Sequence, residues 1–173
     1  MPLSEQAINL MRKANWSEDY RWPVEGDEVE LRALGHTLHK PARDFLRLYG
    51  GLIFTRVSPY SSDPVMCHTN AVEAAIRLHV SHLPPLEQEA GSKLSPLGQE
   101  GYGSFILVMD EEGRVYGVDD TLRLWEFAES GEGWLETCAT AGASRCRRST
   151  GVRSEIPSRR PAARSCYRVY CDA

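Results

Sequence analysis

Two pairs of histidines are the first residues in this chain that could bind a metal ion. His36 with His39, and His79 with His82, have the spacing that places two imidazoles on one face of a helix. Each pair comes shortly before a proline, at the predicted end of a helix, where an imidazole interacts favourably with the helix dipole. We therefore interpret both pairs as helix-terminal residues and expect no metal site.

The cysteines could supply a nucleophile or a zinc site. Cys67 precedes His68 in a predicted strand, where neighbouring side chains point to opposite faces, so the two cannot form a thiolate–imidazole pair. We expect Cys67 to be a buried structural residue. The other cysteines lack the short CxxC spacing of zinc ribbons, and they are Cys138, Cys146, Cys166 and Cys171. An odd total of five favours reduced thiols over a disulfide framework.

Two pairs of adjacent carboxylates could serve in acid–base catalysis, and one pair of glycines could bind a dinucleotide. Glu111-Glu112 and Asp119-Asp120 fall in predicted turns, where a solvated loop is the ordinary explanation. Gly101-x-Gly103 precedes a strand, whereas the glycines of a dinucleotide site follow one. We therefore expect no catalytic residues, no cofactor and no small-molecule substrate.

One enzymatic alternative is kept. His68, His79 and Asp63 could together serve a small metal-dependent hydrolase. Metal analysis of the purified protein would separate this hypothesis from a binding function, because an ion-free and inactive protein leaves it without support.

Charge is the strongest functional feature of the sequence. Residues 1–137 contain 12 Lys and Arg against 22 Asp and Glu, a net charge of -10, whereas residues 138–173 have a net charge of +6. An acidic domain is a poor partner for nucleic acid and a good one for a basic protein, because opposite potentials speed encounter and aromatic anchors supply affinity. The longer acidic cluster is interleaved with aromatic residues and gives our candidate partner-binding residues: Asp110, Glu111, Glu112, Asp119, Asp120, Trp125, Glu126 and Glu129.

Hydrophobic periodicity predicts both helices and strands within residues 1–137. Residues 105–109 are apolar in succession, which is typical of a central strand covered on both faces. Asn70, with Glu73 three residues later, is a capping-box-like start of a helix, and Pro84-Pro85 is expected to stop that helix. Residues 86–103, which contain Pro96-Leu97-Gly98, read as a loop. Predicted helices cover about 4–14, 25–38, 41–49, 70–82 and 132–138, and predicted strands cover 52–57, 65–68, 105–109, 114–118 and 121–125.

The remaining sequence sets the expected domain boundary and location. Residues 1–137 form the predicted domain, and residues 138–173 form a basic tail rich in Arg, Ala, Ser and Cys that has too little apolar bulk to order itself. The abrupt change of composition has a second interpretation, a shift of reading frame in GC-rich DNA. The N-terminal residues 1–13 lack the apolar core of a signal peptide, and no segment is long and apolar enough to span a membrane, so we expect a cytoplasmic protein.

An ordered series of short motifs resembles group three of the SUKH superfamily of bacterial immunity proteins. The series covers about residues 3–137, and its parts are Ala14-Asn15-Trp16-Ser17, residues 42–52 (ARDFLRLYGGL), His68-Thr69-Asn70-Ala71, residues 94–98 (LSPLG) and residues 107–116 (LVMDEEGRVY).

The resemblance implies a non-enzymatic α+β domain, with helices packed against a mixed or antiparallel sheet of about four to six strands. It also implies that the domain neutralises a cognate polymorphic toxin. Such toxins are often nucleases or deaminases, and a basic substrate-facing surface on one of them would suit an acidic partner. The tail departs from the family, in which little usually follows the last helix. A housekeeping protein-binding module with the same fold is a third alternative, and the genomic neighbourhood would separate it from immunity.

Overall fold

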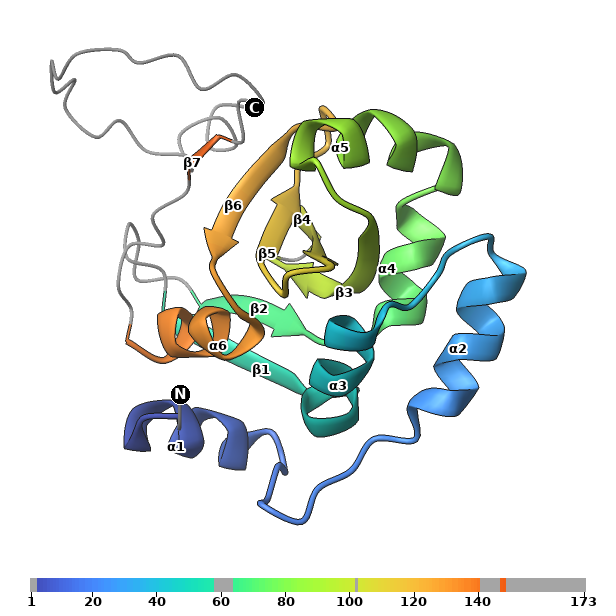
Figure 1. Cartoon of the computed structure of the whole chain (residues 1–173). Helices are drawn as coiled ribbons and strands as arrows, with labels where there is room; N and C mark the ends of the chain where they lie inside the picture. Colours follow the sequence, from blue (N-terminus) through green and yellow to red (C-terminus); the bar gives the residue numbers. More distant parts are fainter. Residues whose placement is uncertain (1–2, 58–63, 102, 141–146, 149–173) are drawn as a thin grey trace, which may run out of the picture.

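The apolar run at residues 105–109 forms the middle strand of the sheet. A computed structural model describes residues 3–57, 64–101, 103–140 and 147–148. In it β4 (Phe105–Asp110) lies between β3 (Leu94–Glu100) and β5 (Val115–Val118), and its side chains alternate between two hydrophobic clusters. Helices cover both faces of the sheet (Figure 1). The prediction of a doubly covered central strand is confirmed.

The strands follow one another in space in the order in which they occur in the chain, and every pairing is antiparallel. This is the simplest sheet topology, because each connection joins neighbours. The other strands are β1 (Ile53–Val57), β2 (Pro64–His68), β6 (Leu124–Ala128) and the two-residue β7 (Arg147–Arg148), which pairs with β6. The predicted α+β class, with an antiparallel sheet, is confirmed.

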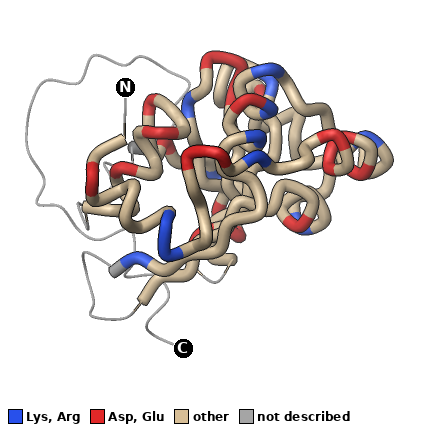
Figure 2. Tube along the Cα trace, turned by 90° about the horizontal axis from the view of Figure 1, so that it is seen from below, with Lys and Arg blue, Asp and Glu red and all other residues tan. Residues whose placement is uncertain are grey.

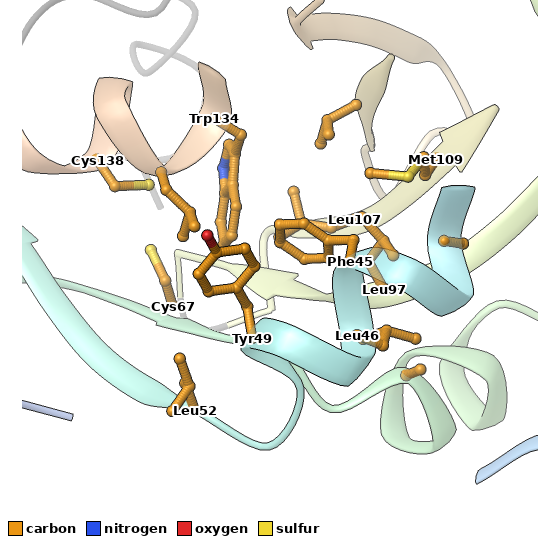
Figure 3. Close-up of a cluster of buried hydrophobic side chains, with 14 of the residues drawn as sticks. Phe45, Leu46, Tyr49, Leu52, Cys67, Leu97, Leu107, Met109, Trp134 and Cys138 are labelled. Carbon is orange, nitrogen blue, oxygen red and sulfur yellow. The ribbon is translucent and has the colours of Figure 1, made fainter. Parts of the chain in front are cut away.

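The larger core lies between one face of the sheet and α1 (Glu5–Lys13), α3 (Lys40–Tyr49) and α6 (Gly131–Ala139). Phe45 and Tyr49, one turn apart on α3, point into this core beside Trp134 of α6 (Figure 3). Ser4 and Ser130 cap the N-termini of α1 and α6 by accepting hydrogen bonds from backbone N–H groups.

A smaller core lies on the opposite face, under α5 (Leu83–Ala90) and Leu78. Leu78 follows α4 (Ala71–Arg77), whose Ala71 and Ala75 belong to the larger core. Asn70 caps α4 by accepting a hydrogen bond from the Glu73 N–H, as the sequence predicted. The remaining helix, α2 (Val24–Ala33), lies beside α3 and α4 (Figure 1), and its Val24 and Leu31 are buried in the larger core.

The expectation of a loop over residues 86–103 is wrong. Pro84 and Pro85, predicted to stop a helix, instead begin α5, because proline fits the first turn of a helix. The next segment is β3, which is buried along its whole length. Its Pro96 and Gly98 resemble turn residues in the sequence, but they flank a register shift in the pairing with β4. A Cβ at Gly98 would lie 1.9 Å from the carbonyl oxygen of His68, so only glycine allows the close strand approach.

Two predicted helices are shorter than expected. The helix predicted over 25–38 ends at Ala33, shortly before Gly35, which has a φ of +83°. The helix predicted to reach residue 82 ends at Arg77 and is followed by a separate 3-10 turn, η1 (Val80–His82). Neither histidine pair therefore lies in the last turn of an α-helix.

The last predicted helix is present and extends slightly beyond the expected domain boundary. α6 ends at Ala139, and Cys138 is buried in the larger core. The interpretations of the tail as disordered or frame-shifted fall almost entirely on residues outside the described ranges. No helix within the described ranges is both long and apolar enough to cross a bilayer.

Candidate functional site

Asp110 was expected to be an exposed contact residue, and the structure corrects this. Its side chain is fully buried at the end of β4, where it accepts hydrogen bonds from the backbone N–H groups of Glu112 and Arg114 at 3.0 and 2.8 Å. It also pairs with Arg114 Nε at 2.7 Å and accepts from the Tyr116 hydroxyl at 3.0 Å. Burial, with Asp110 nearby, raises the pKa of Tyr116. Asp110 therefore organises the β4–β5 turn and is not available to a partner.

Trp125 also makes its contacts within the protein. Its ring packs against the larger core, and its indole N–H donates to Asp119 Oδ2 at 2.9 Å. Burial of Asp119 opposes ionisation, but hydrogen bonds from Arg123, Thr121 and Trp125 outweigh it and hold the pKa of Asp119 below its ordinary value. These two residues stabilise the β5–β6 turn, so Trp125 is not a free aromatic anchor.

The candidate residues divide between the two ends of the sheet. Glu111 and Glu112 lie in the β4–β5 turn, whereas Asp119 and Asp120 lie in the β5–β6 turn, at the other end of β5. Glu129 follows β6 and therefore lies at the same end as the first turn, because Ala128 pairs with Val115. The eight candidates do not form a single patch.

The β4–β5 end collects acidic residues from three parts of the chain. Gly113 of this turn lies close to Pro41 at the start of α3, and Gly131 at the start of α6 lies against Phe45 and Met109. We call this surface the acidic end, and it consists of Asp44, Glu111, Glu112, Glu129 and Glu132.

The acidic end keeps an excess of negative charge. Asp44 pairs with Lys40, and Glu112 pairs with Arg114. Glu111, Glu129 and Glu132 have no Lys or Arg ion-pair partner among the described residues. Glu111 and Glu129 are exposed, whereas Glu132 is partly buried. Lys93 lies near this surface, since Glu87 and, after it, Glu111 raise the pKa of the Lys93 ammonium.

The acidic residues of α2 are Glu25, Asp27, Glu28 and Glu30, and two of these four carboxylates are paired with arginines of α3. Glu25 pairs with Arg47 at 3.1 Å, and Glu28 pairs with Arg43. Charges of both signs are interleaved over much of the chain (Figure 2). Net charge along the sequence therefore overstates the field near α2.

Comparison with known families decides the assignment. Residues 3–140 match the family described as SUKH-3 immunity protein. The chain belongs to this family. The match covers every helix within the described residues and the strands β1–β6, and it agrees with the resemblance inferred from the sequence. No curated protein and no solved structure matches the chain.

The SUKH-3 fold does not bring the residues of the hydrolase hypothesis together. His68 ends β2 and is buried, with Nε2 3.6 Å from Glu73 Oε1, whereas His79 follows the far end of α4 and is exposed. Asp63 lies outside the described residues. His68 and His79, the two described members, are therefore separated by the length of α4.

Among the other histidines of the predicted pairs, His39 has a structural role. His39 caps α3, accepting from the Ala42 N–H through Nδ1 at 3.3 Å, while Nε2 lies 2.8 Å from the Met109 carbonyl oxygen. His36 is buried. The sequence missed the cap because it placed His39 at the end of the preceding helix.

The sequence analysis also missed the apolar residues that face solvent. Large hydrophobic side chains are exposed at positions that belong to four different elements or turns: Val29, Leu34, Ile53, Ile76 and Leu122. Leu122 lies in the β5–β6 turn, beside Asp120. Only burial within the tertiary structure distinguishes these residues from core residues of the same type.

Two buried histidines predict a stability that falls toward acidic pH. Burial lowers the pKa of His36 and of His68 below the ordinary value of 6.5, and for His68 the nearby Glu73 and Gln99 oppose this effect while Arg77 adds to it. The unfolded chain therefore binds more protons than the folded chain once the pH falls below about 6.5. The free energy of unfolding is expected to decrease between pH 7 and the lowered pKa values.

Urea titrations at several pH values check this expectation. Replacement of both residues, His36→Gln and His68→Gln, should flatten the dependence in the window just below pH 6.5, whereas His79→Gln, at an exposed position, should not. An unchanged slope in the double variant would contradict the prediction.

Proposed function

We propose that this protein is an immunity protein that binds one cognate toxin and occludes its active site or substrate groove. Membership of the SUKH-3 immunity protein family is the observation that carries the proposal. The toxin domain is expected to have a basic surface, as a nuclease or deaminase that holds a polyanion would, because opposite potentials accelerate association. The protein acts by binding rather than by catalysis.

The acidic end is the docking surface we favour within the fold. Its unpaired carboxylates come from the β4–β5 turn and the β6–α6 connection, which are held rigidly by Asp110 below the turn and by the Ser130 cap of α6. The β5–β6 end carries Asp120 and the exposed Leu122 and is the competing surface. Asp119 accepts hydrogen bonds from the backbone N–H groups of Thr121 and Arg123 in its own turn. The β5–β6 end therefore has one carboxylate fewer available to a partner.

The first experiment is a capture with the full chain as bait against the proteins encoded beside its gene. Binding of a basic toxin domain that then loses its activity supports the proposal. Folded bait that captures none of these proteins would favour a housekeeping binding module instead. Metal analysis of the same preparation, with an assay for hydrolase activity, tests the enzymatic alternative.

Charge reversal at the acidic end should slow association with the captured toxin. The triple variant Glu111→Lys, Glu112→Lys and Glu129→Lys is expected to lower the association rate constant about tenfold at low salt and to weaken its salt dependence. Stopped-flow or surface-based kinetics at several ionic strengths measure both quantities.

A matched variant separates docking from net charge. Asp19→Lys, Glu30→Lys and Asp120→Lys change the total charge equally at exposed positions away from the acidic end. A smaller effect of this control is expected. Equal effects of the two variants would mean that only net charge matters, and a larger effect of the control would move the interface elsewhere.

A further inference from the structure

Three potential metal ligands from distant parts of the chain meet inside the larger core. Cys67 of β2, Glu100 at the end of β3 and Cys138 of α6 have ligand atoms that all lie within 4.8 Å of one another. The two cysteine side chains point toward each other across the space between β2 and α6 (Figure 3). All three residues are buried, with exposed fractions of 0%, 1% and 3%.

We propose that Cys67, Glu100 and Cys138 form a binding site for a thiophilic divalent cation, with Zn²⁺ as its preferred ion. Two thiolates and a carboxylate are donors that zinc uses in proteins. Three atoms no more than 4.8 Å apart lie within about 2.8 Å of a common centre, and zinc bonds to sulfur and oxygen are about 2.0–2.3 Å long, so small side-chain shifts suffice.

The charge balance of the buried group favours a divalent ion. In the protein as described, the carboxylate of Glu100 is paired with the guanidinium of Arg56, and the two thiols are neutral when protonated. Binding of one Zn²⁺ releases two protons, one from each thiol, and forms two metal–sulfur bonds. The buried group therefore has the same net charge before and after binding, which avoids placing an uncompensated charge in the core.

The carboxylate of Glu100 is already fixed in orientation by neighbouring side chains, as the carboxylate of a metal ligand usually is. Its Oε1 pairs with Arg56, and its Oε2 accepts from the Trp134 indole N–H at 2.9 Å. Hydrogen bonds from neighbouring groups are the usual means by which a ligating carboxylate is fixed in orientation. Because the site is closed to solvent, we expect the ion to enter during folding, when α6 docks on the sheet.

Burial also explains why the Cys138 thiol stays protonated without an ion. Burial, together with the neighbouring Cys67, raises the pKa of Cys138. A bound cation reverses this preference by stabilising the thiolate. Metal binding therefore couples to pH, and it ties α6 to β2 and β3.

The test uses the full chain with the other cysteines changed, Cys146→Ser, Cys166→Ser and Cys171→Ser, so that the tail cannot bind metal. This parent is unfolded and refolded with Zn²⁺ or Co²⁺, and excess ion is removed. One equivalent of metal, thiolate-to-cobalt charge-transfer absorption in the near ultraviolet and a rise in Tm of roughly 5 °C or more are expected.

The matched control adds Cys67→Ser and Cys138→Ser to the parent and should lose both the metal and the absorption. Since that variant could fail to fold, a second measurement uses the parent alone: zinc refolding should release two protons per bound ion. A parent that retains no metal and shows no absorption overturns the proposal. Isolation of the parent as a Cys67–Cys138 disulfide overturns it as well.

Discussion

Replacement of Trp134 by alanine is expected to lower the free energy of unfolding by about 3–5 kcal/mol. The side chain is buried, and its ring lies 6.4 Å from that of Phe45 and 5.8 Å from that of Phe54, measured between centroids. The substitution removes these ring contacts with Phe45 of α3 and Phe54 of β1 and leaves a cavity. Its indole N–H also satisfies Glu100, so the loss includes a hydrogen bond to a buried carboxylate.

Urea unfolding followed by circular dichroism measures this loss without relying on the tryptophan. Trp134→Phe separates the two contributions, because it keeps most of the ring and removes only the N–H donor, and it should cost about 1–3 kcal/mol. A typical domain has only about 5–15 kcal/mol of stability, so the alanine variant should be close to unfolding. An alanine variant that loses less than the phenylalanine variant would contradict this account of the core.

Replacement of Asp110 by alanine is expected to cost about 2–4 kcal/mol of stability. The carboxylate is fully buried and accepts from two backbone N–H groups, Arg114 Nε and the Tyr116 hydroxyl. Its removal leaves the buried tyrosine hydroxyl without this acceptor. The cost stays below that of an enclosed ion pair because the Arg114 side chain is 39% exposed and can turn to water.

Glu111→Ala is the matched control, since it removes a neighbouring carboxylate from an exposed position of the same turn. It should change stability by no more than about 0.5 kcal/mol. The two variants also separate stability from binding: Asp110→Ala should weaken toxin binding only through loss of folded protein or distortion of the turn. An Asp110→Ala variant as stable as the unmodified protein would contradict the buried structural role of Asp110 and would favour the original interpretation as a surface contact residue.

Much of the fold could be predicted from the sequence because hydrophobic periodicity is a local property. The run at 105–109 predicted a strand covered on both faces, and the Asn70 and Glu73 spacing predicted the start of α4. Local rules failed where one residue type fits two structures. Pro84-Pro85 can stop a helix or begin one, and Pro96 with Gly98 can form a turn or a bulge in a buried strand.

The candidate surface was predicted less well, because exposure is not a property of a single residue. Asp110, Glu111 and Glu112 are consecutive acids in the sequence, and yet the first is buried under the turn that exposes the other two. The same holds for α2, in which Glu25 and Glu28 pair with Arg47 and Arg43 of α3. Glu30 of the same helix is exposed.

The sequence by itself determined the fold class, the central strand, the charge asymmetry and, through an ordered series of motifs, the SUKH-3 family. The tertiary structure alone decided which acids gather at one end of the sheet and that Cys67, Glu100 and Cys138 meet in the core. The physical reason is that periodicity and composition act over a few residues, whereas burial and ligand geometry depend on the packing of elements far apart in the chain.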